Sequence, residues 1–339
     1  KNTFCCIINN RSVIDLKILS VNAGSSSLKF QLYEMPEEKV LISGLMERIG
    51  VGNSFYTIKV NGEKIKKEVE LNNHEEAFET LVKELEENNV VESLDEIEGI
   101  GHRVVQGGDY FDKTVVIDDE VLAKIDELSS LAPLHNPAAV TGIKAAKDVF
   151  PNAVQTAVFD TAFHQTMPKE NFLYALPISW YTDLKVRRYG AHGTSHKFVS
   201  QRMNEILKRD DTKIITCHIG NGASVSAVLN GKCVNTSMGL TPNAGLIMGT
   251  RCGDIDASII PYVMEKTNMS PKEIDNAINK ESGLLALSRK SSDSRDIEDG
   301  IASGDENCIL AQKMYVRRIV DYIAKYYVEM KGCDAIVFT

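Results

Sequence analysis

The chain has 339 residues, enough to bury a large core and, on length alone, to favour two domains. Its 38 basic and 47 acidic residues give a net charge of −9, which argues against non-specific binding to nucleic acid or to an anionic membrane surface. No stretch approaches the about 20 apolar residues of a membrane helix. Seven scattered cysteines without a CxxC pair favour a reducing cytoplasm. Residues 1–16 lack a signal-peptide pattern and are set apart as an N-terminal extension without an assigned role.

Two segments, one in each half of the chain, share one pattern. Lys17–Tyr33 and Lys213–Leu229 each contain an apolar strand, a short loop of Gly, Ser, Ala and Asn, and a return strand. Such loops expose consecutive backbone N–H groups that hold anionic oxygens, although Gly and Ser also make ordinary hairpin turns. The repetition favours a nucleotide held by its phosphates between two lobes, and therefore phosphoryl transfer.

Alternating and helical spacings of apolar residues predict the remaining elements. Strands beyond the two segments are predicted at 40–46, 56–60, 66–71, 97–105, 154–159, 232–236 and 335–338. Helices are predicted at 74–89, 118–131, 195–207 and 306–330, and two more begin at Pro137 and at the Ser270 capping box. Strand clusters followed by helices, twice over, predict two α/β lobes with mixed sheets, 17–161 and 162–339.

Two arginines occupy matching positions in the two halves. Arg103 lies at the end of a predicted buried strand and precedes Gly107-Gly108, and Arg251 lies in GTRCGDID. An arginine at a strand end can grip carboxylate or phosphoryl oxygens with two N–H groups. Pairing of Arg103 with a neighbouring aspartate is the alternative. The symmetric placement favours two cations, from opposite lobes, that neutralise the charge of a transferring phosphoryl group.

Polar residues at two strand ends complete the predicted site in the first half. Asn22, Ser25 and Ser27 belong to the first phosphate loop, and Lys29 supplies a point charge. Asp160 ends the strand AVFD, where α/β folds place catalytic groups, so it is predicted to hold Mg²⁺ or to orient the acceptor. A helix N-cap is the alternative role for Asp160.

The histidines divide into donors and structural residues. His192 and His196 lie four apart, but Gly193 interrupts the turn and no third ligand follows, so a metal site is not predicted. His192 is instead predicted to donate a hydrogen bond to an anionic oxygen, and His196 to be structural. His135 is a second donor candidate, with a core histidine as the alternative. His164 is interpreted as structural.

Eight motifs in chain order, between about Lys17 and Thr339, resemble the acetokinase family of short-chain carboxylate kinases. These motifs are NAGSSSLKFQLY, GHRVVQGGDYF, LAPLHNPAA, VFDTAFHQTMP, RRYGAHGTSH, HIGNGAS, GLTPNAGLIMGTRCGDID and SSDSRDIE. The resemblance implies the duplicated actin/Hsp70/sugar-kinase architecture, which is ribonuclease H-like. It also implies a homodimer that makes acetyl phosphate from acetate and ATP by direct in-line attack, with Mg²⁺ or Mn²⁺.

The resemblance further implies roles for individual residues. Catalytic roles fall on Arg103, Asp160, His192 and Arg251. Residues implied for phosphate and adenosine binding are Asn22, Ser25, Ser27, Lys29, His218, Gly220, Asn221, Gly222, Ala223, Ser224, Asp293, Ser294 and Arg295. Residues implied to surround the acid are Arg103, Val105, Leu134, His135, Ala191 and Pro242. Metal ligation falls on Asn22 and Asp160.

Three departures from the family pattern bear on activity. Ala191 stands where many relatives carry Phe, so we expect a larger acyl pocket that accepts propionate better than usual, within the ~1–3 kcal/mol that one methylene is worth. Arg289-Lys290 replaces a Gly-hydrophobic pair beside the adenosine segment. The chain ends at Thr339, where relatives continue into a Gly-rich adenosine loop, so we expect little kinase activity from the chain as written.

Two kinds of alternative remain open from the sequence. One is a propionate or butyrate kinase, or an acetate kinase that uses pyrophosphate as donor. The other is a catalytically silent ATP-binding module, since the same fold serves chaperones and filaments. The paired arginines, Asp160 and His192 argue against the silent module, because nucleotide binding alone does not require them.

Overall fold

The structure is a computed structural model that describes residues 16–133 and 135–339. The chain divides into two compact units, the first ending at Ala162 and the second beginning at Phe163. Of the predicted extension, residues 1–15 lie outside the described part, and Leu16 is the first residue of a strand. None of the described helices is both long and apolar enough to cross a membrane.

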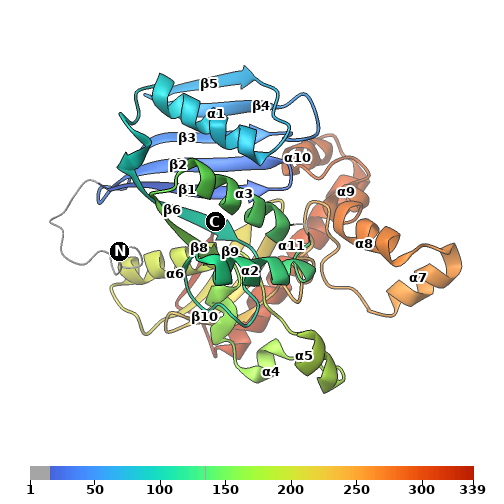
Figure 1. Cartoon of the computed structure of the whole chain (residues 1–339). Coiled ribbons are helices and arrows are strands. Elements are labelled where there is room, and N and C mark those ends of the chain that lie inside the picture. Colours follow the sequence, from blue (N-terminus) through green and yellow to red (C-terminus); the bar gives the residue numbers. More distant parts are fainter. Residues whose placement is uncertain (1–15, 134) are drawn as a thin grey trace. The chain divides into compact units, whose positions relative to one another are not determined.

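Unit 1 is built on an eight-stranded mixed sheet in the order β5-β4-β3-β2-β1-β6-β8-β7 (Figure 1). The strands are β1 (Leu16–Gly24), β2 (Ser27–Met35), β3 (Lys39–Glu47), β4 (Phe55–Val60), β5 (Glu63–Glu68), β6 (Ile97–Val104), β7 (Val115–Val116) and β8 (Val154–Phe159). The helices are α1 (His74–Glu87), α2 (Asp119–Glu127) and α3 (Asn136–Val149). The strands β1 to β5 form antiparallel hairpins, whereas β1, β6 and β8 run parallel to one another.

Helices α1 and α3 cover one face of this sheet (Figure 1). Leu19 and Val21 of β1 and Phe78 of α1 are buried in one hydrophobic cluster, so this face of β1 belongs to the core. Because successive side chains of a strand point to opposite faces, Asn22 faces away from that cluster. Asn22, Arg103 and Asp160 lie at or directly after the carboxyl ends of the parallel strands β1, β6 and β8. The carboxyl ends of such strands are the usual place for a site in an α/β fold.

Unit 2 contains a four-stranded sheet in the order β11-β10-β9-β12. Its strands are β9 (Lys213–Ile219), β10 (Ala223–Leu229), β11 (Lys232–Thr236) and β12 (Ala335–Phe338). Its helices are α4 (Lys169–Phe172), α5 (Ile178–Leu184), α6 (Gly193–Leu207), α7 (Ile259–Thr267), α8 (Pro271–Lys280), α9 (Gly283–Ser288), α10 (Ser294–Ala302) and α11 (Glu306–Glu329).

The two faces of the second sheet differ in chemistry. Tyr322 and Tyr326 of α11 pack with Ile215 and Cys217 in one hydrophobic cluster. The opposite face of β9 presents Thr216, whose hydroxyl group meets an imidazole from α6. Helix α11 thus covers one face through nonpolar contacts, and helix α6 covers the other face through buried polar contacts.

The two units repeat one topology. In unit 1 the order β3-β2-β1-β6 consists of three antiparallel strands followed by a parallel strand beside the first. In unit 2 the order β11-β10-β9-β12 has the same directions. The two segments with the shared sequence pattern are the first hairpin of each unit, β1-β2 and β9-β10.

Most predicted elements occur with shifted ends. The turn signals at Asn61-Gly62 and Asn230-Gly231 form two-residue hairpin turns with positive φ at all four residues, as such turns require. The Ser270 capping box is present, with both reciprocal hydrogen bonds. The strand predicted at 66–71 lies instead at Glu63–Glu68, because the turn fixes the register of its partner.

Candidate active site

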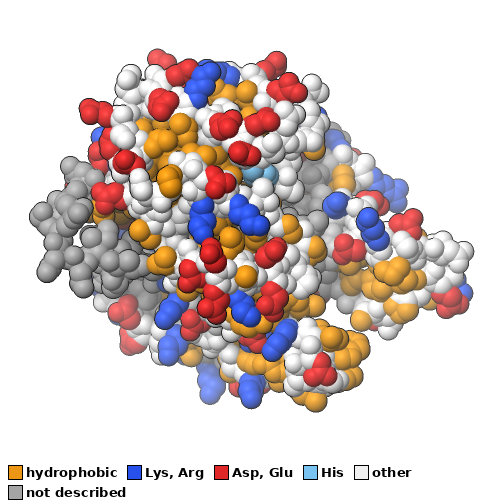
Figure 2. Space-filling view, in the orientation of Figure 1, with side chains coloured by type: hydrophobic (Ala, Val, Ile, Leu, Met, Phe, Trp, Pro, Cys, Tyr) orange, Lys and Arg blue, Asp and Glu red, His pale blue; other side chains and the backbone are white. Residues whose placement is uncertain are grey.

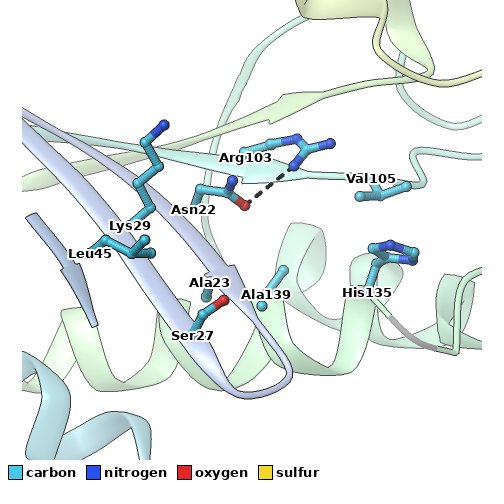
Figure 3. A pocket seen from close by; sticks show the side chains of 10 residues that line it. Asn22, Ala23, Ser27, Lys29, Leu45, Arg103, Val105, His135 and Ala139 are labelled. Atoms are coloured by element: carbon cyan, nitrogen blue, oxygen red, sulfur yellow. Dashed lines mark hydrogen bonds between the residues drawn. The ribbon is translucent and has the colours of Figure 1, made fainter. Parts of the chain in front are cut away.

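A pocket of about 250 Å³ lies in unit 1 at the carboxyl ends of β1 and β6 and the start of α3 (Figure 3). Six of the residues singled out from the sequence line it: Asn22, Ser27, Lys29, Arg103, Val105 and His135. The pocket also has four lining residues that the sequence did not single out: Ala23, Gly24, Leu45 and Ala139. Leu45 is the register partner of Lys29 in β3, a signal that becomes visible only when the strand pairing is known.

Arg103 and Asp160 form a bidentate ion pair. Nε of Arg103 lies 3.1 Å from Oδ1 of Asp160, and Nη2 lies 2.6 Å from Oδ2. The carboxylate raises the pKa of Arg103, against the opposing effect of burial. Since a guanidinium group has five N–H donors, this pair leaves the Nη1 side for other partners. The alternative weighed from the sequence, an arginine paired with an aspartate, is what the structure contains.

The third nitrogen of Arg103 turns toward the first hairpin (Figure 3). Its Nη1 lies 3.5 Å from Oδ1 of Asn22, and Asn22 is directly opposite Lys29 in the β1-β2 ladder. Both side chains therefore share one face of the hairpin, and Lys29 is exposed. Ser25 lies in the two-residue turn, whereas Ser27 is already the first residue of β2. The first phosphate loop is thus a tight hairpin turn.

The start of α3 supplies a second wall of the pocket. His135 is the N-cap residue of α3, without a hydrogen bond from its side chain to the helix. Helix α3 approaches β1 closely at Gly142, where a Cβ atom would lie only 2.8 Å from the Cβ of Ala23. Val105 follows β6 and lines the same pocket. Leu134 lies outside the described residues.

In unit 2 the second hairpin carries a bend at Gly220-Asn221-Gly222. The backbone N–H of Gly249 donates to the carbonyl of Asn221 at 2.9 Å, which ties the bend to the segment before Arg251. A Cβ atom at Gly222 would lie 3.3 Å from Nη1 of Arg251 and 3.6 Å from Nε2 of His192. The bend, the guanidinium group and the imidazole therefore lie together within this unit.

Arg251 contrasts with Arg103 in its partners. Its Nη1 donates to the carbonyl of Pro242 at 3.3 Å and approaches the sulfur of Met248, and within the described residues no carboxylate pairs with it. Burial lowers the pKa of Arg251. A partly buried guanidinium group with only neutral partners is a suitable binding group for an anion.

His192 has a left-handed backbone conformation, with φ of 57°, directly before α6. Its Nδ1 lies 2.9 Å from the hydroxyl oxygen of Ser224, and its ring contacts that of His218, with centroids 4.2 Å apart and the ring planes tilted by 33°. Nδ1 of His218 lies 2.9 Å from Oγ of Ser195. Gly193 begins α6 rather than interrupting it. Among the described residues no cluster of three His, Cys, Asp or Glu side chains suits a metal ion.

The remaining residues singled out from the sequence have mainly local contacts. Asp293 caps α10 and pairs with the exposed Arg295 at 2.5 Å, which lowers the pKa of Asp293 to about 2. Ser294 is the first residue of α10. Ala191 is 2% exposed and belongs to the hydrophobic cluster of unit 2. Ala223 is fully buried in β10.

The chain is similar to known proteins of one family. A sequence profile of the Acetokinase family matches residues 17–339. The acetate kinase of Macrococcus caseolyticus (strain JCSC5402) is 55% identical over 325 residues, which cover 95% of this chain and 82% of that protein. Acetate kinase 2 of Listeria monocytogenes serotype 4b (strain F2365) is 53% identical with the same coverage.

Two solved structures are similar to this chain in fold and in sequence. The acetate kinase of Porphyromonas gingivalis superposes with a TM-score of 0.90 at 45% identity, and a propionate kinase from Francisella tularensis subsp. tularensis SCHU S4 with a TM-score of 0.91 at 43% identity. Each comparison covers 95% of this chain and 82% of the other. The duplicated α/β topology is therefore the actin-like sugar-kinase fold, as the sequence predicted. The chain belongs to the acetokinase family, and it is a phosphotransferase with a carboxyl group as acceptor.

Proposed function

We propose that this protein transfers the γ-phosphoryl group of ATP to the carboxylate of acetate, giving acetyl phosphate and ADP in a reversible reaction. The observation that carries the proposal is the orientation of Arg103. One edge of its guanidinium group is fixed by Asp160, and its Nη1 side faces a pocket of about 250 Å³. Such an arrangement suits a small carboxylate.

The acid would lie in the unit 1 pocket with its carboxylate on Arg103. Val105, Leu45 and Ala139 give this pocket nonpolar lining atoms for a short alkyl group. Lys29 adds a positive charge beside the hairpin. Arg103 holds the carboxylate so that one oxygen is free to attack phosphorus in line with the leaving ADP, and positioning of this kind lowers the barrier without a covalent intermediate.

The phosphates would be bound by groups of unit 2. In the bend at Gly220–Gly222 the N–H of Gly220 donates to the carbonyl of Gly222, so the N–H groups of Asn221 and Gly222 are the ones offered to anionic oxygens. Arg251 adds a cation without a carboxylate partner of its own among the described residues. His192 donates a hydrogen bond to the phosphoryl group as its charge spreads over the equatorial oxygens.

The donor atoms of unit 1 fit a magnesium ion, the metal that the family implies. Asp160 and Asn22 offer a carboxylate and an amide oxygen, and both contact Arg103. A carboxylate has about four lone-pair positions, more than the two that Arg103 uses on Asp160. Mg²⁺ usually has one or two carboxylate ligands besides water and phosphate. When bound, the ion would neutralise charge on the phosphates.

A panel of acids against two phosphoryl donors tests the proposal. Acyl phosphate formation is measured with acetate, propionate and butyrate, each with ATP and with pyrophosphate. The assays use this chain and a version continued past Thr339 to the length of its relatives. We expect the highest kcat/KM for acetate with ATP. A higher value for propionate would favour the activity named for the Francisella tularensis structure, and nucleotide binding without any acyl phosphate would favour a silent module.

We further infer a homodimer. Figure 2 shows hydrophobic side chains on the surface of α5 and of α7, and Ile178, Leu184 and Tyr262 are each more than half exposed. Exposed nonpolar patches are more often part of a protein–protein interface than the polar remainder of a protein surface is. Size-exclusion chromatography with light scattering is expected to give twice the mass of the chain, and a monomer at micromolar concentration would contradict the inference.

The cysteines favour a reducing compartment, in agreement with a cytoplasmic enzyme. Cys217, Cys233 and Cys308 are buried thiols, and burial raises the pKa of each. Buried thiols of this kind are poorly reactive.

A further inference from the structure

A hydrogen-bonded chain of hydroxyl and imidazole groups connects β9, α6 and β10 and ends at His192. Oγ1 of Thr216 lies 2.7 Å from Nδ1 of His196, and Nε2 of His196 lies 2.7 Å from Oγ of Ser224. The same Ser224 oxygen lies 2.9 Å from Nδ1 of His192. Thr216, His196 and Ser224 are fully buried. Three hydrogen bonds therefore connect the polar face of β9 to the imidazole beside Gly222.

His196 must be neutral for the direction of this chain to be defined. Burial, and to a smaller extent the nearby rings of His164, His192 and His218, holds the pKa of His196 well below its ordinary value. A neutral imidazole has one N–H donor and one acceptor nitrogen. Each nitrogen of His196 has a hydroxyl partner, so one hydroxyl donates to the ring and the other accepts from it.

Two directions are possible, and the distances distinguish them. If His196 donated from Nδ1, the proton of Thr216 would be left with the backbone carbonyl of Ser226, 3.5 Å away and at the limit of hydrogen bonding. In the opposite direction every buried proton has a bond of 2.7 to 2.9 Å. Because a poorly bonded buried hydroxyl costs free energy, the second direction is favoured.

In the favoured direction, Thr216 donates to Nδ1 of His196, and Nε2–H of His196 donates to Ser224. The hydroxyl of Ser224 must then donate to Nδ1 of His192, which leaves the proton of His192 on Nε2. That nitrogen is on the edge of the ring that faces Gly222, where Nη1 of Arg251 also lies. A neutral donor at this position avoids a second positive charge beside the guanidinium group.

We propose that Thr216, His196 and Ser224 are positioning residues that hold His192 as its Nε2–H tautomer, so that His192 presents a donor and not a lone pair to the transferring phosphoryl group. The catalytic part of this inference rests on the proposed function, whereas the tautomer does not. The side chain of Ser224, assigned to phosphate binding from the sequence, acts on His192 instead. In addition to its structural role, His196 helps to orient the imidazole of His192.

The tautomer can be measured directly in the folded protein. Long-range ¹H–¹⁵N correlation spectra of protein with ¹⁵N-labelled histidine show which ring nitrogen bears the proton, at a mildly alkaline pH where an ordinary imidazole is neutral. The variant His192→Asn identifies the His192 signals. We expect Nε2–H for His192 in the wild type, and a mixture of tautomers in Ser224→Ala. An Nδ1–H tautomer in the wild type, or an unchanged tautomer in Ser224→Ala, would overturn the proposal.

Ser226→Ala is the matched control. Ser226 is two residues away on β10, is equally buried, and bonds to Thr236 at 2.8 Å through its hydroxyl, so the control removes a buried hydroxyl from the same strand but not from this chain. We expect the control to retain the Nε2–H tautomer of His192. His196→Gln, whose amide N–H can still donate to Ser224, is expected to restore most of what a nonpolar His196→Leu variant loses.

Kinetics separates this inference from the proposed function. In Ser224→Ala we expect kcat to fall by about 10-fold with little change in the KM for nucleotide, at the low end of the loss seen when a group that orients a metal-binding histidine is removed. A tautomer change with a kcat equal to that of Ser226→Ala would uphold the positioning of His192 and overturn its proposed catalytic role. Equal losses of kcat in both serine variants with no tautomer change would leave only a structural role for Ser224, which contradicts the proposal.

Discussion

Asp160 fixes one edge of Arg103, with Nε 3.1 Å from Oδ1 and Nη2 2.6 Å from Oδ2. The carboxylate is fully buried, whereas the arginine side chain is 37% exposed. The buried carboxylate holds one edge of the guanidinium group in a fixed orientation, and the exposed edge remains available to a ligand. The pair therefore accounts for how a single arginine can be both held by the protein and offered to a substrate.

The first prediction concerns the shape of this cation. Arg103→Lys keeps the positive charge but cannot offer two parallel N–H groups to Asp160 and another side to the acid. We expect kcat/KM for acetate to fall about 100-fold, because orientation is lost while attraction remains. Steady-state assays with saturating ATP measure this. An unchanged kcat/KM would show that only the charge of Arg103 is needed.

Arg103→Ala provides the comparison, and it has a second effect. It removes the guanidinium group that pairs with the buried Asp160, so we expect the free energy of unfolding to drop by about 2–3 kcal/mol, somewhat less than for a pair buried on both sides. Denaturant unfolding measures this loss. For that reason Arg103→Lys, and not Arg103→Ala, is the cleaner test of catalysis.

The second prediction concerns acid stability. Burial lowers the pKa of His102 to about 4, with a smaller opposing effect of the hydrogen bond to Gln155. The unfolded chain therefore binds more protons than the folded one between pH 4 and the ordinary histidine pKa of about 6.5. His102 favours folding fully above that range, and we expect up to about 3 kcal/mol of stability to be lost as the pH falls through it.

His102→Gln tests this assignment, because glutamine can still bond to Gln155 but does not titrate. Urea unfolding of both proteins is measured at several pH values. We expect the loss between neutral and acidic pH to be smaller in the variant. Parallel curves would mean that other groups cause the acid sensitivity.

The third prediction concerns the bend between β9 and β10. An alanine at Gly222 would place a methyl group 3.3 Å from Nη1 of Arg251, tighter than an ordinary contact. Since Arg251 is in part buried, we expect Gly222→Ala to displace the guanidinium group and to lower kcat by about 10-fold, with the protein still folded. Kinetics together with a thermal melt decide this. Full activity would show that the space in front of Arg251 is not used.

The fourth prediction concerns Ala191. Because this side chain is 2% exposed within the hydrophobic cluster of unit 2, Ala191→Phe is expected to overpack the core and to lower stability by about 1–3 kcal/mol. If the small residue enlarges the acyl pocket, the same variant will shift the ratio of kcat/KM toward acetate over propionate. A stability loss without any change in this ratio would reject the hypothesis of an enlarged pocket.

Sequence reasoning located most elements because their signals are local. The capping box at Ser270, the Asn-Gly turns and the helical spacing of α1 and α11 depend on a few neighbouring residues. Short helices such as α5 and α9 were not predicted, since so few residues give no clear period. The resemblance to the acetokinase family also came from the sequence, through motifs of adjacent residues, and the comparisons confirm it.

The sequence alone determined the duplicated fold and the residue types that are suited to phosphate and carboxylate chemistry. Only the tertiary structure decided which of these residues are partners. It paired Arg103 with Asp160, which are far apart in the chain, and it joined Thr216, His196 and Ser224 to His192. The physical reason is that periodicity and turn signals are local, whereas the direction of a guanidinium edge or of an imidazole proton depends on atoms that strand pairing and helix packing bring within 3 Å.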